Sequence, residues 1–155
     1  MSRSSEPVST LRIEGQPENL ARIGDWVMES ARACGLNQED AFKIQLAVDE
    51  ACTNVIEHAY NGQGGPIELS CQRDGAEIQV TIHDWGQPFD PTAIRPPDLA
   101  APLKDRPIGG LGLHFMHALM DRVQFTFDKA RGNILTMVKA CPLPQEQDPT
   151  PPAAG

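Results

Sequence analysis

The chain has 155 residues, of which 40% are hydrophobic, and this suffices for one domain with its own core. It carries 13 basic and 21 acidic residues, a formal net charge of −8, which disfavours a general attraction to nucleic-acid phosphates or anionic lipid surfaces. No apolar run reaches the roughly 18 residues of a membrane span, and the N-terminus lacks the apolar core of a signal peptide. The four cysteines have neither metal-ligand nor redox spacing. We expect a cytoplasmic protein that contacts proteins or small molecules directly, and neither nucleic acid nor membrane.

The first half of the chain predicts one strand and two helices. Apolar and polar residues alternate over Ser9–Glu14, which is typical of a half-buried strand. Apolar residues at steps of three and four predict a helix over Glu18–Cys34, and Gly35 is a natural stop. A second helix is predicted from an N-cap at Asn37 down to Tyr60.

The second half predicts two hairpins separated by a long loop and a helix. Strands over Ile67–Arg73 and Ala76–His83 flank an Asp-Gly pair, which is a strong hairpin signal. Gln87–Pro107 contains six prolines and predicts an irregular loop, followed by a helix over 113–121 and a hairpin over 123–140. This order of elements predicts an α+β fold, a two-layer α/β sandwich whose mixed, mainly antiparallel sheet is covered by helices on one face.

The same features set the predicted domain boundaries. The domain is expected to span residues 9–141, after an N-terminal extension over residues 1–8. Pro142–Gly155 has five prolines and almost no large apolar side chains, so it predicts a disordered tail.

Glu50 and Asn54 are the first candidate functional pair. Four residues separate them on the second predicted helix, so their side chains share one face. Asn54 could supply an oxygen ligand to Mg²⁺, and Glu50 could orient or deprotonate an attacking hydroxyl. The simpler interpretation is an exposed polar strip on an amphipathic helix, which is common.

Two further motifs can serve a nucleotide. Asp84 ends the second hairpin strand beside Gly86, where a carboxylate could accept a hydrogen bond from an exocyclic amino group such as that of adenine. An ordinary Asp-x-Gly turn is the alternative. The segment Gly109–Gly112 opens a predicted helix, whose free amide groups favour bound phosphate, although glycine-rich helix entries also occur without a ligand.

The order of these motifs carries a family resemblance. The segments DEACTNVIEHAY (49–60), DWGQPFDP (84–91) and GGLGLHFM (109–116) resemble the N, G1 and G2 boxes of the GHKL ATPase superfamily. The sequences of these segments are most similar to those of the anti-sigma-factor serine/threonine kinases, which have an HATPase_c_2-like domain. The resemblance spans residues 9–140 and implies the Bergerat-type ATP-binding fold of that superfamily.

The resemblance also implies roles for individual residues. Asn54 would hold Mg²⁺ against the phosphates of ATP, Glu50 would be the general base, and Asp84 would read the adenine amino group. Gly86 would leave room for the adenine ring. Phosphate contacts would come from the glycine-rich loop and from a lid over residues 87–108, namely Gly110, Leu111, Gly112, Lys104 and Arg106. For Lys104 and Arg106, plain solvated charge is an equal alternative. One departure is Asn133, where the family often has a threonine that helps to bind adenine.

The implied function is an ATP-dependent serine/threonine protein kinase that acts as an anti-sigma factor or similar partner-switching regulator. Its implied partners are an anti-anti-sigma protein with a STAS-like domain, which it would phosphorylate, a sigma factor, and a second copy in a homodimer. An alternative is a regulatory module in which ATP only shapes a docking surface, although the presence of Glu50 favours the kinase. A fragment of a two-component histidine kinase is a weaker alternative, because the 60 residues before the Asp84 motif contain no additional dimerisation helices with a phosphoacceptor histidine.

Overall fold

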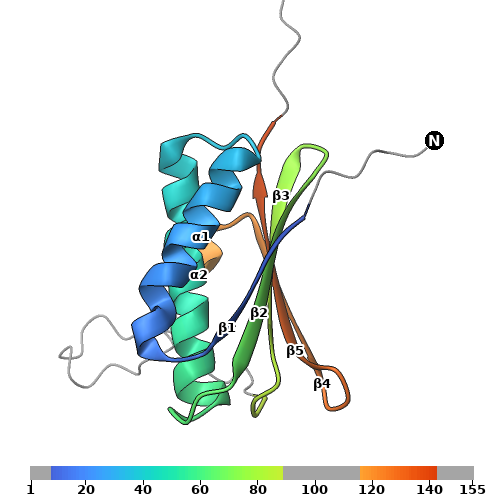
Figure 1. Ribbon diagram of the computed structural model, residues 1–155. Coiled ribbons are helices and arrows are strands. Elements are labelled where there is room, and N and C mark those ends of the chain that lie inside the picture. Colours follow the sequence, from blue (N-terminus) through green and yellow to red (C-terminus); the bar gives the residue numbers. More distant parts are fainter. Residues whose placement is uncertain (1–7, 89–115, 143–155) are drawn as a thin grey trace, which may run out of the picture.

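A five-stranded sheet with two long helices on one face forms the fold (Figure 1). The computed structural model describes residues 8–88 and 116–142. The strands follow the sheet order β1-β2-β3-β5-β4, and their bounds are β1 (Ser9–Glu14), β2 (Pro66–Asp74), β3 (Glu77–Asp84), β4 (Arg122–Asp128) and β5 (Gly132–Ala140). The α+β two-layer prediction is confirmed, and these elements fall within the predicted domain.

The sheet is antiparallel at every described pair of strands, so the prediction of a mixed sheet was wrong for this part of the chain. Two pairs, β2 with β3 and β4 with β5, are hairpins. Between β1 and β2 the two helices return the chain to the end of the sheet that it left, so that Pro66 lies opposite Glu14. An antiparallel pairing follows from that return.

The helices are α1 (Leu20–Ala33), preceded by a 3-10 turn η1 (Pro17–Asn19), and α2 (Gln38–Asn54). Asn37 is the predicted N-cap, because its Oδ1 accepts a hydrogen bond of 2.8 Å from the backbone N–H of Asp40. The predicted second helix does not stay α-helical down to Tyr60. After Asn54 it widens into a π-helical turn, η2 (Val55–Ala59), which ends with a bond of 2.9 Å from Tyr60 N–H to the carbonyl of Val55. Such turns are rare and frequently lie at functional sites.

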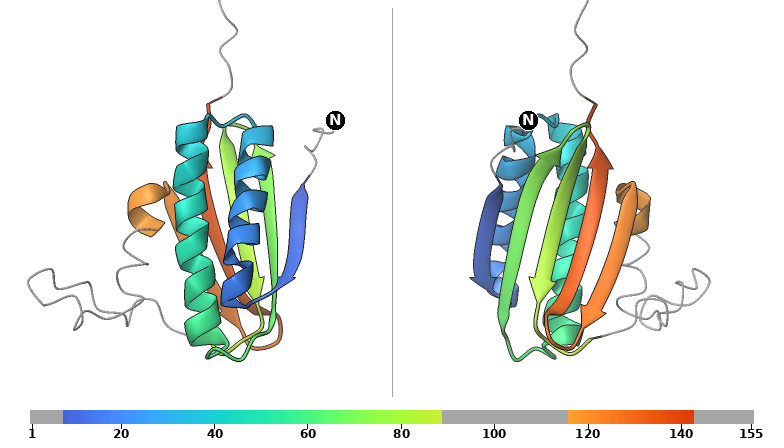
Figure 2. Two further views of the ribbon diagram at one scale, coloured as in Figure 1. Left: turned by 60° about the vertical axis from the view of Figure 1, so that its left-hand side comes forward. Right: turned by 90° about the vertical axis from the view of Figure 1, so that its right-hand side faces the viewer.

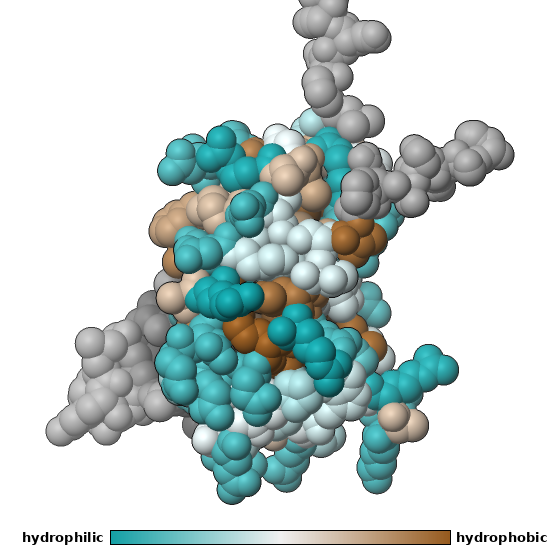
Figure 3. All heavy atoms as spheres, in the orientation of Figure 1, coloured by the Kyte–Doolittle hydropathy of each residue, from teal (hydrophilic) through white to brown (hydrophobic). Residues whose placement is uncertain are grey.

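The core fills the space between the helices and one face of the sheet. Alternate residues of β2 and β3 are buried, whereas the opposite face of the sheet is covered by none of the described helices (Figure 2). The largest fully buried side chains come from both layers and include Ile23, Ile44, Ile67, Leu69, Ile78 and Ile82. Figure 3 shows hydrophobic residues reaching the surface where the helical layer meets the edge strand β1. None of the described helices is long and apolar enough to cross a membrane.

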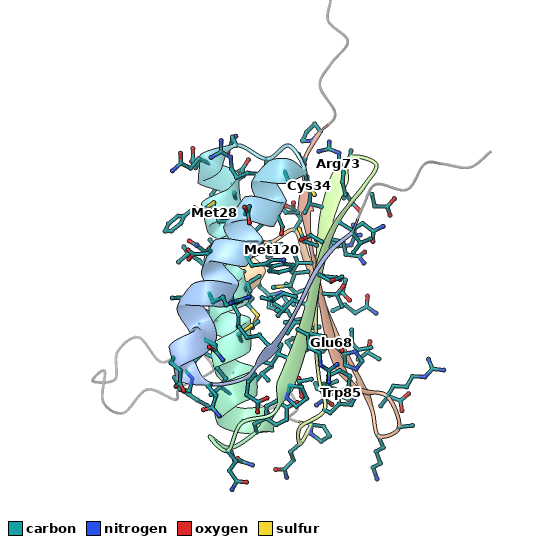
Figure 4. All side chains as sticks on the ribbon, viewed as in Figure 1. Met28, Cys34, Glu68, Arg73, Trp85 and Met120 are labelled. Atoms are coloured by element: carbon teal, nitrogen blue, oxygen red, sulfur yellow. The ribbon has the colours of Figure 1, made fainter. Side chains whose placement is uncertain are left out.

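Hydrogen bonds from Arg73 link the end of α1 to the end of β5. Its Nη1 donates to the carbonyl of Cys34 at 2.5 Å and to Sγ of Cys141 at 3.1 Å, and its Nη2 donates to the carbonyl of Cys141 at 2.6 Å. Cys71 lies beside this cluster, in hydrogen-bonding contact with Cys34. Figure 4 places Cys34 and Arg73 at one end of the molecule and Trp85 at the other. Two cysteines that are far apart in the sequence, Cys34 and Cys141, therefore meet at one guanidinium, and Cys71 contacts the first of them.

This cluster predicts a stability effect. Arg73→Ala should lower the free energy of unfolding by about 1–3 kcal/mol, because half-buried carbonyls at the ends of α1 and β5 lose a charged donor. Urea denaturation measures the loss. The matched control is Arg12→Ala, which removes an exposed ion pair with Glu68 and should cost less than about 1 kcal/mol. Equal losses in the two variants would contradict the assigned role of Arg73.

Candidate functional site

A pocket lies where the end of α2 faces the neighbouring ends of β3, β5 and β4. Most of its wall is apolar, with side chains from both layers that include Val55, Ile82, Met116, Phe125 and Leu135. Three polar residues, Asn54, Asp84 and Asn133, also line it, and all three are buried. An apolar slot with a few convergent polar groups is the usual form of a small-molecule site.

Asp84 is held in one orientation by two hydrogen bonds. Its Oδ1 accepts from the backbone N–H of Gly86 at 2.9 Å and from Nδ2 of Asn133 at 2.8 Å. Among residues 8–88 and 116–142 no group donates to Oδ2, so this is the oxygen left for a ligand. Burial raises the pKa of Asp84, and these hydrogen bonds and the charge of His83 oppose the rise. A carboxylate whose charge is disfavoured by burial gains strongly from a further donor.

Asn133 is a buried residue of the pocket whose place beside Asp84 the sequence does not show. β5 pairs with β3 so that Asn133 lies directly opposite Asp84. Its Nδ2 donates to Asp84 and also to the carbonyl of Gly86 at 3.1 Å. In the sequence this asparagine is only a departure from the threonine that the family often has. In the fold it positions Asp84. The register between β3 and β5 is the feature from which this role could have been predicted.

Gly86 is required by the packing of the chain itself. A Cβ at this position would lie 2.4 Å from the carbonyl oxygen of Ala59 in η2. The next residue, Gln87, donates its backbone N–H to the same oxygen at 2.7 Å. The segment after β3 therefore rests on the π-helical turn. This contact gives the glycine a structural reason in addition to the room for a base that the sequence predicts.

Tyr60 also fixes this segment, and sequence reasoning missed it. Its hydroxyl donates to the carbonyl of Pro66 at 2.6 Å and accepts from the backbone N–H of Trp85 at 2.9 Å. One phenol thus connects the end of η2, the start of β2 and the residue after Asp84.

The two phenylalanines of β4 alternate along the strand, a pattern typical of core residues, but they differ in burial. Phe125 is partly buried and packs against the core, but Phe127 is 36% exposed. Both line the pocket. β4 is an edge strand, where neighbouring elements cover a side chain less completely than in the middle of the sheet.

Asn54 is the last residue of α2 and is 3% exposed, which rules out the exposed polar strip that was the alternative from sequence. Its side chain lines the same pocket as Asp84. Among the described residues none makes a hydrogen bond to its amide. An amide oxygen to which no described residue donates, inside a pocket, fits a site for a hard cation such as Mg²⁺.

Glu50 lies one helical turn before Asn54 and does not line the pocket. It is half-buried, and burial, followed by the charges of Asp49 and Glu57, raises its pKa. A carboxylate with a raised pKa is a stronger base, which is the property that proton abstraction requires.

The remaining predicted site residues belong to the lid and to the glycine-rich loop. Most of the predicted lid (87–108) and five predicted site residues lie outside the described residues; the five are Lys104, Arg106, Gly110, Leu111 and Gly112.

A sheet with helices on one face and a pocket at the end of the second helix is an arrangement that can hold a nucleotide. Residues 13–139 match the model of the histidine kinase-like ATPase domain, and the chain belongs to this family. ATP binding follows from that membership.

Several relatives are serine-protein kinases. Serine-protein kinase RsbW of Halalkalibacterium halodurans is 39% identical over 113 residues, which cover 70% of this chain and 68% of the relative. RsbW of Bacillus cereus is 28% identical over 130 residues, or 81% of each chain. A crystal structure of the RsbU and RsbW domains of a Mycobacterium tuberculosis protein matches 90% of this chain and 35% of its own, with a TM-score of 0.62 and 16% identity. The structural likeness supports the fold alone.

Proposed function

We propose that this chain is a serine/threonine protein kinase and anti-sigma factor that works by partner switching in the cytoplasm. Its protein substrate is an anti-anti-sigma protein with a STAS-like domain. One observation carries the proposal: buried Asn54 lies in the pocket beside Asp84, and Glu50 lies one turn away on the same helix. The names of the RsbW relatives support the same activity.

The pocket binds the adenine end of ATP. The flat base lies between apolar walls from the helical layer and the sheet. Its exocyclic amino group donates to Oδ2 of Asp84, the oxygen that the hydrogen bonds from Gly86 and Asn133 leave open. Guanine has a carbonyl at that position, which would face the carboxylate as a second acceptor. ATP is therefore preferred over GTP.

The phosphates extend toward the end of α2. The Asn54 amide oxygen would hold Mg²⁺, and a bound Mg²⁺ would supply positive charge that favours transfer. The resemblance implies that Gly110, Leu111 and Gly112 would contact the phosphates, and Lys104 and Arg106 are the candidate charged contacts; all five lie outside the described residues. The oxygen of the substrate hydroxyl bonds to the γ-phosphorus, and Glu50 accepts the proton that this hydroxyl loses. The bond to the β-phosphate oxygen breaks, and ADP leaves with the electron pair.

The test uses the whole chain with labelled ATP, Mg²⁺ and the STAS-type protein encoded nearest to it. Phosphoserine or phosphothreonine on that protein is the expected result. ATP-dependent complex formation without transfer would instead favour a regulatory binding module, and transfer to a histidine would overturn the serine/threonine kinase.

Asn54→Ala is expected to abolish Mg²⁺-dependent ATP binding, because it removes a metal ligand from the pocket. Calorimetric titration with and without Mg²⁺ measures the loss, and circular dichroism checks that the fold is retained. Thr53→Ala is the matched control, since the Thr53 hydroxyl donates to the carbonyl of Asp49 at 2.8 Å on the exposed side of α2. Wild-type affinity in Asn54→Ala with Mg²⁺ present would remove Asn54 from the site.

A further inference from the structure

α2 presents two large apolar side chains to solvent. Phe42 is 49% exposed and Leu46 is 39% exposed, and they lie one turn apart. The core side of the same helix is formed by other residues, such as Ala41, Ile44 and Val48. Phe42 and Leu46 therefore contribute little to the fold. Figure 3 shows hydrophobic residues at the surface of the helical layer.

These residues belong to one line of side chains that leads to the phosphate end of the site. Phe42, Leu46 and Glu50 follow each other at intervals of four residues, and we call this line the α2 ridge. Successive members are neighbours on a helix surface, about 6 Å apart along the axis. Leu46 is thus about 6 Å and Phe42 about 12 Å from Glu50 along α2.

We propose that Phe42 and Leu46 are the docking surface for the protein substrate of this kinase. The proposal rests on the proposed function, because the substrate must bring a hydroxyl to Glu50. A standard protein interface covers about 800 Å² on each partner, which corresponds to a patch about 16 Å in radius. A globular partner centred near Glu50 covers Leu46 and Phe42. Apolar anchors near the centre of an interface carry most of the binding energy.

The charges around the ridge define the chemistry of the partner. Glu39 and Asp49 on α2 and Glu57 on η2 are exposed acids. The nearby Lys43 lies 3.8 Å from Asp40, so its charge is partly balanced. The surface is apolar along the ridge and acidic at its sides. It fits a STAS-type protein with an apolar patch beside its phosphorylated residue and basic side chains around that patch.

The test is steady-state phosphorylation of the nearest-encoded STAS-type protein by wild type and by the double variant Phe42→Ala, Leu46→Ala. Alanine favours the helix, and both side chains are exposed, so the fold should be retained. KM for the protein substrate should rise at least tenfold, with kcat and the affinity for ATP unchanged. Glu39→Lys should also raise KM, and more strongly at low salt. The control is Val8→Ala, which removes a 45% exposed apolar side chain before β1 and should leave KM unchanged.

Complex formation is measured on the same samples, which separates this proposal from the kinase function. Transfer with an unchanged KM in the double variant would overturn the docking surface and leave the kinase intact. ATP-dependent binding without transfer, weakened in the double variant, would overturn the kinase and support the surface. Neither binding nor transfer by wild type would overturn both.

Discussion

Asp84→Asn should weaken ATP binding by about 1–3 kcal/mol and leave the nucleotide-free fold intact. The two hydrogen bonds that orient Asp84 both end on Oδ1, and an asparagine Oδ1 can still accept both, although more weakly than a carboxylate. Its Nδ2 then occupies the place of Oδ2 and presents a donor to the adenine amino group, which is also a donor. The loss is therefore specific to the ligand. Calorimetric titration with ATP measures the loss of affinity. If the wild-type protein bound GTP as tightly as ATP, the recognition of the adenine amino group by Asp84 would be contradicted.

The same variant gives a pH signature in stability. Burial raises the pKa of Asp84 above its ordinary 3.8, so the protonated form favours the folded state. That contribution is complete below the unfolded pKa and is lost as the pH rises through the folded pKa. Asparagine carries no charge, so the stability of Asp84→Asn relative to wild type should increase over that interval and then level off. Urea denaturation from about pH 4 to about pH 8 tests the sign. A relative stability that fell with rising pH would mean that the Asp84 charge is favourable in the empty pocket.

Local patterns in the sequence were enough for most of the fold. Alternation and helical spacing predicted the five strands and the start of both long helices within a few residues, and Asn37, followed by Asp40, was identified as an N-cap. The π-helical turn after Asn54 was missed. Its apolar residues continue the stripe of α2 without a break, and nothing in a pattern of apolar positions distinguishes a wide turn from a regular one.

The candidate site was predictable only as separate residues. Sequence spacing puts Glu50 and Asn54 on one helix face, but the burial of Asn54 depends on the strands packed across from it. Asp84 and Asn133 are 49 residues apart and meet because of the register between β3 and β5. Register is set by burial and turn geometry over whole strands, so a single motif does not reveal it.

Glu50→Gln should reduce phosphate transfer by about 10²–10⁴-fold, the usual contribution of a positioned general base. ATP binding should be nearly unchanged, because Glu50 does not line the pocket and glutamine keeps the size of the side chain. Single-turnover transfer to the STAS-type protein measures the loss. Transfer at the wild-type rate would show that Glu50 is not the base and that positioning of the phosphates carries the reaction.

The pH dependence of transfer distinguishes a base from a merely structural carboxylate. The pKa of Glu50 is raised by burial first and then by the charges of Asp49 and Glu57, so wild-type transfer should fall as the pH drops through a value above the ordinary 4.5. Asp49→Asn removes one of these charges. It should move the acidic limb of the pH–rate profile, where transfer falls, to lower pH and keep the plateau rate. Asp49 is exposed on the same helix, which makes it the matched control for the loss of a carboxylate. If Glu50 acts only by packing, the acidic limb stays in place in Asp49→Asn, and Glu50→Gln shows the same pH profile as wild type at a lower rate.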